Sequence, residues 1–178
     1  MRSLVLAGIA ALAFASTLTV AAQQVTKETV PGVTNFARLE TTVACAGAIK
    51  VEAIPEIKKL GYASIINLRQ PSEQGANVPE NTTYAKEIGL NYINIPFNAQ
   101  APDSKAVDTF LGLIANKANQ PVYVHCGSAS RVGSMWMIKR VLQDGWALDK
   151  ATEEAKLIGL RSPALEQFAV EYINSHKK

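Results

Sequence analysis

Three short apolar segments, separated by helical stretches, constrain the fold of this chain more strongly than any other feature. The segments 62–69 (YASIINLR), 91–97 (NYINIPF) and 121–126 (PVYVHC) are rich in Ile, Val and Tyr, which is typical of buried strands. Strands that alternate with helices form a mainly parallel sheet with helices on both faces. We therefore predict an α/β fold with a mainly parallel sheet flanked by helices.

The remaining segments complete this pattern. Residues 35–47 form a weaker candidate for an opening strand or hairpin, and helices are predicted over 54–60, 83–88 and 104–116. Asp103 precedes the last of these helices and is a preferred N-cap residue.

The C-terminal third is predicted to be helical. One helix begins near Val132, a second has Asp149 as its expected cap, and a third begins at Pro163 with Ser162 as its cap. A Ser followed by Pro at a helix start is a specific local signal, because Pro suits the first helical position.

The N-terminus reads as a secretory signal peptide. Arg2 supplies a positive charge, residues 4–14 form an apolar run, and cleavage is expected after Ala22 or, as an equal alternative, after Ala21. The apolar run is shorter than the roughly 20 residues needed to cross a bilayer. We therefore expect a periplasmic or secreted protein with no membrane span after cleavage.

The mature chain has the size of one domain. We assign residues 1–22 to the signal peptide, 23–34 to an N-terminal extension and 35–178 to a single compact domain. The formal net charge of +3 is spread along the chain, without a basic run interleaved with aromatic residues, so no nucleic acid is expected as a partner. A small anionic substrate suits this charge.

The numbers of Cys and His residues exclude two kinds of protein, disulfide-stabilised scaffolds and zinc proteins. The chain has two Cys and two His, which exclude a disulfide scaffold and give no zinc-site spacing. No Gly-rich dinucleotide motif is present. We therefore predict neither a metal nor a cofactor.

The segment HCGSASR, residues 125–131, carries the clearest chemical signal. Cys126 stands where the most apolar strand ends and a helix begins, at the carboxyl edge of the sheet where such folds bind ligands. The loop residues Gly127, Ser128, Ala129 and Ser130 are all small. Their backbone N–H groups can therefore turn around one centre and, with the helix N-terminus, form an oxyanion site.

Charge around Cys126 favours a nucleophile. The helix N-terminus, Arg131 and a protonated His125 would each stabilise the thiolate. Arg131 can fork onto two oxygens of a tetrahedral anion while the loop N–H groups bind the others, so phosphate is the natural ligand. The alternative is a merely buried Cys at a strand end beside a surface Arg.

These segments resemble a known family. A Cys and an Arg that bracket a phosphate loop, preceded by VHC, look like the protein tyrosine and dual-specificity phosphatase superfamily. The order LGYASIINLRQPSEQ, GLNYINIPF, PVYVHCGSASRVG and DGWALDKATEEAKLIGL is similar to the beta-lactamase hydrolase-like (DUF442) phosphatase-like domain. The resemblance implies a cysteine-phosphatase-like fold.

The loop departs from the superfamily pattern at three points. The usual loop has five residues between Cys and Arg, whereas this one has four, as in DUF442 domains. The usual mid-loop Gly is Ala129, which is strained if that position needs a positive φ. The usual hydroxyl after the Arg is Val132, although Ser130 or Ser134 can take its place.

Four further residues are candidates for the site. Asp103 lies where related phosphatases keep a general acid, but it also suits a helix cap. Arg69 and Glu73 follow a strand at the same sheet edge and either line the pocket or form a solvated turn. Cys45 is either a buried apolar residue or a redox partner of Cys126 in an oxidising compartment.

Three functions remain open from the sequence. The leading hypothesis is hydrolysis of a phosphomonoester through a phosphocysteine intermediate. A four-residue loop also resembles the rhodanese family, whose Cys transfers sulfur as a persulfide. The third reading is a non-catalytic phosphate-binding module, because fold does not settle reaction.

Overall fold

The computed structural model describes residues 25–177 and is built on a six-stranded sheet of order β1-β2-β3-β6-β4-β5. The strands β3, β6, β4 and β5 are parallel, and β1-β2-β3 form antiparallel pairs at one edge. The strands are β1 (Thr26–Lys27), β2 (Ala37–Glu40), β3 (Val43–Ala46), β4 (Ser64–Asn67), β5 (Asn91–Asn94) and β6 (Val122–His125). The predicted mainly parallel sheet and opening hairpin are confirmed.

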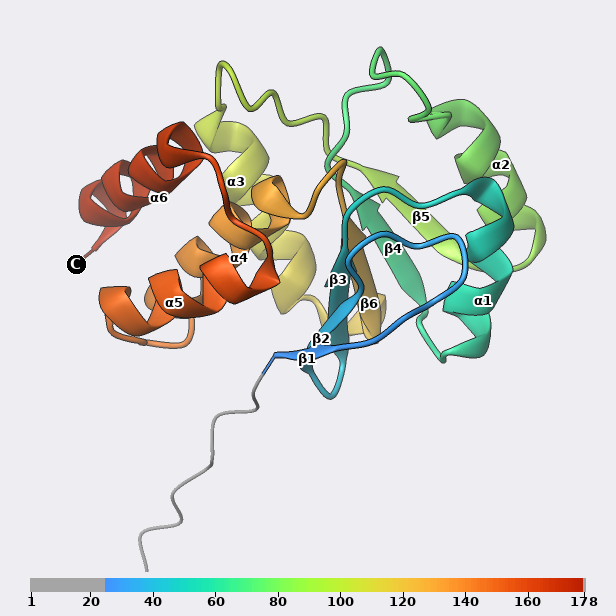
Figure 1. Ribbon diagram of the computed structural model, residues 1–178, viewed down its shortest axis with the longest axis horizontal. Helices are drawn as coiled ribbons and strands as arrows, with labels where there is room; N and C mark the ends of the chain where they lie inside the picture. Colours follow the sequence, from blue (N-terminus) through green and yellow to red (C-terminus); the bar gives the residue numbers. More distant parts are fainter. Residues whose placement is uncertain (1–24, 178) are drawn as a thin grey trace, which may run out of the picture.

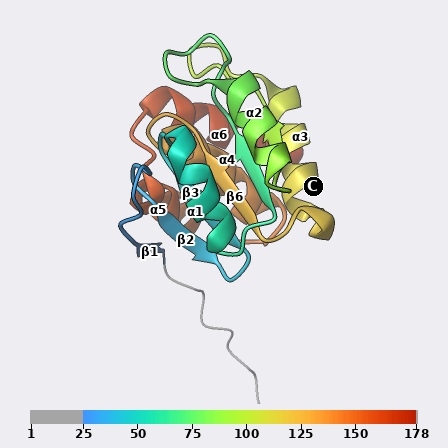
Figure 2. The ribbon, with the colours of Figure 1, turned by 90° about the vertical axis from the view of Figure 1, so that its right-hand side faces the viewer.

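Helices cover both faces of the sheet (Figures 1 and 2). One face carries α1 (Ile54–Lys59) and α2 (Val78–Glu87), and the other carries α3 (Ser104–Ala115), α4 (Ser130–Leu142), α5 (Leu148–Ile158) and α6 (Pro163–His176). Two single 3-10 turns, η1 (Val51–Ala53) and η2 (Lys117–Asn119), precede α1 and β6.

The central strand β6 is apolar because both of its faces are buried. Val122 and Val124 point into the core beneath α3 to α6, where fully buried Trp136 packs. Tyr123 points to the opposite core, against the side of α1 and α2. Burial on both faces fixes the position of β6. Because Cys126 directly follows this strand, the position of the HCGSASR loop is fixed as well.

Three helix starts differ from the sequence predictions. The helix predicted over 83–88 is longer, because α2 begins at Val78, after Asn77 in a left-handed conformation. The helix predicted near Val132 begins two residues earlier, at Ser130. Asp149 is not the cap of α5, which begins at Leu148 with Ala147 at the N-cap position; Asp149 lies in the first turn instead.

The caps at Asp103 and Ser162 are confirmed. The Asp103 carboxylate accepts a hydrogen bond from the Lys105 N–H at 3.0 Å, and the Ser162 hydroxyl accepts one from the Leu165 N–H at 3.3 Å. Both side chains satisfy N–H groups that have no partner within their helix.

The N-terminal extension assigned to 23–34 contributes to the sheet where it is described. Thr26–Lys27 pairs with β2, and Val33 forms an isolated bridge with Ile49. The predicted signal peptide, residues 1–22, lies outside the described residues. Within residues 25–177, none of the helices combines the length and the apolar character needed to cross a membrane.

Candidate active site

The HCGSASR loop connects the end of β6 to the start of α4, at the carboxyl edge of the parallel strands. Cys126 is fully buried, and its N–H donates to the Ala46 carbonyl of β3 at 3.4 Å. Four residues separate it from Arg131, which lies in the first turn of α4. The structure therefore places the thiol and the guanidinium at the position where α/β folds bind ligands.

The loop backbone leaves its N–H groups available. The Gly127 carbonyl accepts from the Ala48 N–H, and the Ala129 carbonyl accepts from the Gly133 N–H, both at 2.9 Å. Among the described residues, no acceptor takes the N–H of Gly127, Ser128 or Ala129. Such a run of free N–H groups at a helix N-terminus forms an anion site.

Ala129 adopts the left-handed conformation, with φ of 71°. This conformation costs a residue with a Cβ about 1–2 kcal/mol, so the loop is strained where related phosphatases have Gly. A Cβ added at Gly159, after α5, would lie 2.9 Å from the Ala129 Cβ. Gly159 therefore makes the room in which the loop turns.

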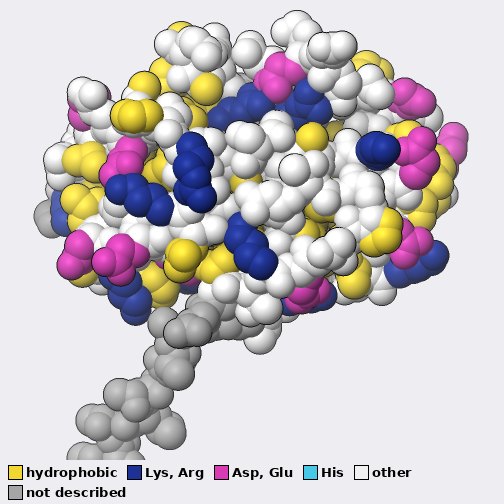
Figure 3. All heavy atoms as spheres, viewed as in Figure 1, with side chains coloured by type: hydrophobic (Ala, Val, Ile, Leu, Met, Phe, Trp, Pro, Cys, Tyr) yellow, Lys and Arg dark blue, Asp and Glu magenta, His cyan; other side chains and the backbone are white. Residues whose placement is uncertain are grey.

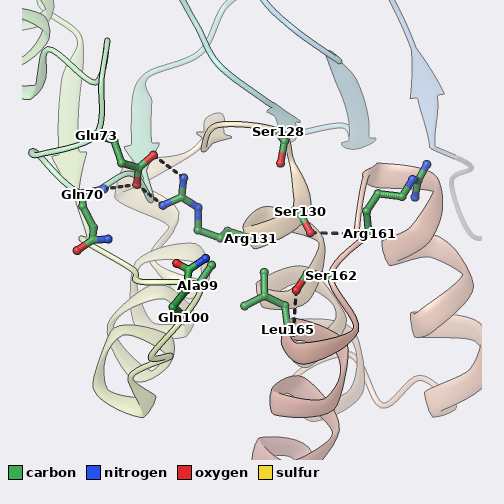
Figure 4. Close-up of a pocket in the computed structure, with 10 residues that line it drawn as sticks. All are labelled: Gln70, Glu73, Ala99, Gln100, Ser128, Ser130, Arg131, Arg161, Ser162 and Leu165. Atoms are coloured by element: carbon green, nitrogen blue, oxygen red, sulfur yellow. Dashed lines mark hydrogen bonds and ion pairs between the residues drawn. The ribbon is translucent and has the colours of Figure 1, made fainter.

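Glu73 holds Arg131 in a two-pronged ion pair. Nη1 of Arg131 donates to Oε1 at 2.5 Å and Nη2 donates to Oε2 at 2.8 Å (Figure 4). Nη1 also donates to the carbonyls of Leu68 and Phe97 at 3.2 and 3.1 Å. The guanidinium is thereby fixed beside the loop by groups from the segments that follow β4 and β5.

The Glu73 carboxylate is ionised. Partial burial alone would raise its pKa, but hydrogen bonds from Arg131 and from the Gln70 N–H outweigh burial and lower the pKa to about 2. Arg69 adds a hydrogen bond to Glu73 at 3.2 Å and donates to the carbonyls of Gln74 and Gly75. Arg69 therefore stabilises the turn that carries Glu73.

His125 is neutral at pH 7. Burial, followed by the charge of Arg69, lowers the pKa of this imidazole to about 3. Burial and the nearby charge of Arg69 therefore disfavour the protonated His125 that the sequence analysis expected beside the thiol. Its Nε2 lies 3.4 Å from the Tyr92 hydroxyl, so it belongs to a buried polar cluster behind the loop.

A cavity of about 500 Å³ opens over the loop. Ser128, Ser130 and Arg131 line it from the loop and α4, and Glu73 lines it from the turn after β4 (Figure 4). Arg161, which the sequence analysis did not select, lines the opposite side. No local pattern marks Arg161, because only the packing of α5 brings it to the cavity.

The remaining candidates lie outside this cavity. Asp103 is exposed and acts as the α3 cap; it is not among the cavity-lining residues. Arg69 lines a neighbouring cavity with Gln74 and Gly75. Cys45 lies on β3 as a buried free thiol, and burial raises its pKa. The Ser134 hydroxyl donates to the Arg131 carbonyl, so it is engaged within α4.

Within residues 25–177, no group of three or more His, Cys, Asp and Glu side chains is arranged to hold a metal ion. The cavity is lined by hydroxyls of Ser128 and Ser130 and by Arg131, and the loop that supplies them begins at the buried Cys126 thiol. Together with the parallel sheet, this arrangement defines the class of cysteine-dependent phosphatases, in which a thiolate attacks a phosphoryl group held by amides and Arg.

Comparison with known proteins identifies the family. Residues 17–171 match the family described as DSP-PTPase phosphatase fused to NAD+ kinase. The chain belongs to this family and is a cysteine-dependent phosphatase of the protein-tyrosine-phosphatase type. A search of curated protein sequences gives no match.

Solved structures share the fold. A DUF442 phosphatase from Shewanella putrefaciens CN-32 has a TM-score of 0.70 at 18% identity, over 83% of this chain and 96% of that one. The catalytic domain of the PP-IP phosphatase Siw14 from S. cerevisiae has a TM-score of 0.69 at 22% identity, over 83% and 91%. A Cys-to-Ser variant of P. aeruginosa TpbA bound to phosphotyrosine has a TM-score of 0.65 at 17% identity, over 88% and 91%.

Proposed function

We propose that the chain hydrolyses phosphomonoesters through a phosphocysteine at Cys126. The observation that carries this proposal is the loop that follows Cys126, in which three successive N–H groups have no acceptor among the described residues and Glu73 fixes Arg131 at the other end of the loop. Such donors stabilise the equatorial oxygens of a phosphoryl group during transfer.

The reaction has two displacements. The Cys126 thiolate attacks phosphorus, the ester P–O bond breaks, and the leaving alkoxide takes a proton. Water then attacks the phosphocysteine, which releases inorganic phosphate and restores the thiolate. Ser130 is the hydroxyl placed to assist this release, since its oxygen accepts the Arg161 N–H at 3.1 Å and its own proton has no acceptor among the described residues.

Protonation of the leaving group is the role proposed for Asp103. Its carboxylate caps α3, so it would have to give up the Lys105 hydrogen bond to reach the substrate. A site without a general acid cleaves aryl phosphates, whose leaving groups are good, much faster than alkyl phosphates. An Asp103→Asn variant that cleaves alkyl phosphates as fast as the unaltered protein would show that Asp103 is only a cap.

Paired assays on the reduced protein test the reaction. Hydrolysis of p-nitrophenyl phosphate is expected for the unaltered chain and is expected to be lost in Cys126→Ser. Sulfur transfer from thiosulfate to cyanide is the reaction that a persulfide mechanism requires. Sulfur transfer without phosphate release would overturn the proposal, and anion binding with neither activity would leave a phosphate-binding module.

We further infer that the enzyme acts outside the cytoplasm. The support is the N-terminal sequence, with Arg2 followed by the apolar run 4–14 and small residues up to Ala22. Mass spectrometry of the protein recovered from periplasm and medium is expected to find an N-terminus at Gln23 or one residue earlier. An intact residue 1 on cytoplasmic protein would contradict export.

A further inference from the structure

The wall of the active-site cavity consists mainly of uncharged polar side chains. They are two amides and three hydroxyls, those of Gln70, Gln100, Ser128, Ser130 and Ser162. Gln70 follows β4, Gln100 lies between β5 and α3, and the three Ser residues lie in the phosphate loop, at the start of α4 and just before α6. Figure 4 shows the two amides below the Glu73–Arg131 pair. Four separate segments of the chain therefore bring hydrogen-bonding groups to one cavity.

These side chains keep hydrogen-bonding capacity that the described part of the chain does not use. The two amides and the Ser128 hydroxyl form no hydrogen bond within residues 25–177, where Gln70 and Gln100 bond only through their backbone N–H groups. The Ser130 and Ser162 hydroxyls each accept one backbone N–H, at 3.1 and 3.3 Å, and keep their own protons. The wall therefore offers both donors and acceptors to a ligand.

The charged groups near the cavity are already engaged by the chain. Glu73 forms its ion pair with Arg131, which serves the phosphate loop. The Arg161 guanidinium is turned away from the cavity, and its Nη1 donates to the carbonyls of Lys156 and Leu160 at 2.6 and 2.9 Å (Figure 4). A leaving group that carries its own charge gains no ion pair from these groups, whereas an uncharged polar leaving group can use the amides and hydroxyls.

Apolar surface is scarce in the same wall. Of the described lining residues only Ala99 and Leu165 are apolar, Leu165 is 1% exposed, and none is aromatic. An aromatic ring binds mainly through apolar and aromatic contacts, so phosphotyrosine fits this wall poorly. On the face seen in Figure 3, hydrophobic side chains are scattered among polar and charged ones, so that face presents no large apolar surface to a protein substrate.

From these contacts we propose that the substrate is a small phosphomonoester of a polyhydroxylated alcohol, such as a sugar phosphate. Its phosphate occupies the loop after Cys126, and the hydroxyls of its leaving group exchange hydrogen bonds with the Gln70 and Gln100 amides and with the wall hydroxyls. This inference rests on the proposed phosphatase function and adds its substrate class.

The test compares glucose 6-phosphate with cyclohexylmethyl phosphate. Both compounds carry a saturated ring on a CH₂–O–phosphate group and release a primary alcohol, but only the sugar has hydroxyls on its ring. Calorimetric titration into Cys126→Ser, which is expected not to turn them over, is expected to give the sugar a Kd at least about tenfold lower, since each hydrogen bond contributes several-fold. In the unaltered enzyme, kcat/KM should be higher for the sugar by a similar factor.

Gln100→Met in the Cys126→Ser background removes one amide and keeps the length of an exposed side chain. It should raise the Kd of glucose 6-phosphate about threefold to tenfold and change that of cyclohexylmethyl phosphate by less than about twofold. The matched control is Gln74→Met, at an exposed residue that does not line this cavity, and it should keep the sugar preference.

Three results would overturn the proposed substrate class. They are equal binding of the two compounds, an equal loss of preference in Gln100→Met and Gln74→Met, and tighter binding of O-phosphotyrosine than of glucose 6-phosphate.

Failure of the proposed function is a separate result. If the reduced, unaltered protein releases no phosphate from p-nitrophenyl phosphate, the phosphatase proposal fails. The titrations do not depend on turnover, so a sugar preference that depends on Gln100 would then support the polyhydroxyl-binding wall alone. Phosphate release without any sugar preference would leave the phosphatase and overturn only the substrate class.

Discussion

Glu73 determines where the Arg131 guanidinium lies. Its two oxygens receive both terminal nitrogens of Arg131, and Arg69 and the Gln70 N–H hold the carboxylate from the other side. A forked pair of this kind fixes the plane of the guanidinium as well as its position. The loop therefore presents Arg131 to the anion in one orientation.

Replacing Glu73 with Gln removes one of the two accepting oxygens and places an NH₂ group against the guanidinium. We expect kcat/KM for p-nitrophenyl phosphate to fall roughly tenfold to hundredfold, because a small displacement of a positioning group weakens transition-state binding. Glu80→Gln, at an exposed site in α2, is the control and should leave kcat/KM unchanged. An unchanged kcat/KM in Glu73→Gln would show that Arg131 is positioned without it.

The buried His125 makes stability depend on pH. Its folded pKa of about 3 lies below the ordinary value of about 6.5, so between these values the unfolded chain binds the proton more readily. The contribution is fully present above pH 6.5 and is lost as the pH falls towards 3. We expect the free energy of unfolding to drop by about 1.4 kcal/mol per unit below pH 6.5.

Urea unfolding at pH 7.0, 6.0 and 5.0 measures this slope, in a range where most carboxylates stay ionised. His125→Asn should flatten the slope. The only other histidine of the sequence is His176, which is exposed, so His176→Asn should keep the slope. A steep slope that survives in His125→Asn would assign the proton uptake to another group.

At the scale of elements, the phosphate loop is braced by two close approaches of backbone. A Cβ at Gly47, after β3, would lie 3.1 Å from the Gly127 carbonyl oxygen. A Cβ at Gly159, after α5, would lie 2.9 Å from both the Ala129 Cβ and the Asn35 Nδ2. The loop conformation therefore depends on the ends of elements that are distant in sequence.

Gly159→Ala should lower the free energy of unfolding by about 2 kcal/mol or more. The residue has a φ of 146°, which strains any side chain, and the added methyl would overlap Ala129. In an Ala129→Gly background one of the two overlaps is removed, so the cost of Gly159→Ala should shrink. A double-mutant cycle by urea unfolding measures this coupling, and strictly additive effects would contradict the contact.

Features of the structure that depend only on residues close together in the sequence were predicted correctly in three cases. The Asp103 and Ser162 caps and the strand that ends at Cys126 depend on neighbouring residues, and all three were predicted from the sequence. The Glu73–Arg131 pair joins residues 58 apart, so the sequence placed both near one sheet edge without revealing the ion pair. Arg161 had no local signal, because the packing of α5 on α4 decides where it lies.

At the scale of the whole molecule, the described N-terminal segment connects the sheet edge to the active site. Lys27 donates to the Ile158 carbonyl at the end of α5, and Val30 is buried against the α1 side of the sheet. The Thr34 N–H donates to the Ala48 carbonyl, and the Thr34 carbonyl accepts from Gly47. The neighbouring Ala48 N–H in turn holds the phosphate loop at Gly127.

Removal of residues 23–34 tests whether this segment is only an extension, as the sequence boundary at 35 predicted. A chain that starts at residue 35 loses β1, the burial of Val30 and both Thr34 backbone bonds. Because a buried Val contributes about 2 kcal/mol and each kcal/mol shifts Tm by about 2–4 °C at this size, we expect Tm to fall by at least about 5 °C relative to a chain that starts at residue 23. Activity should fall as well, since Gly47 and Ala48 lose the partner that positions them against the loop. Equal Tm and equal kcat/KM in the two chains would place the domain boundary at residue 35.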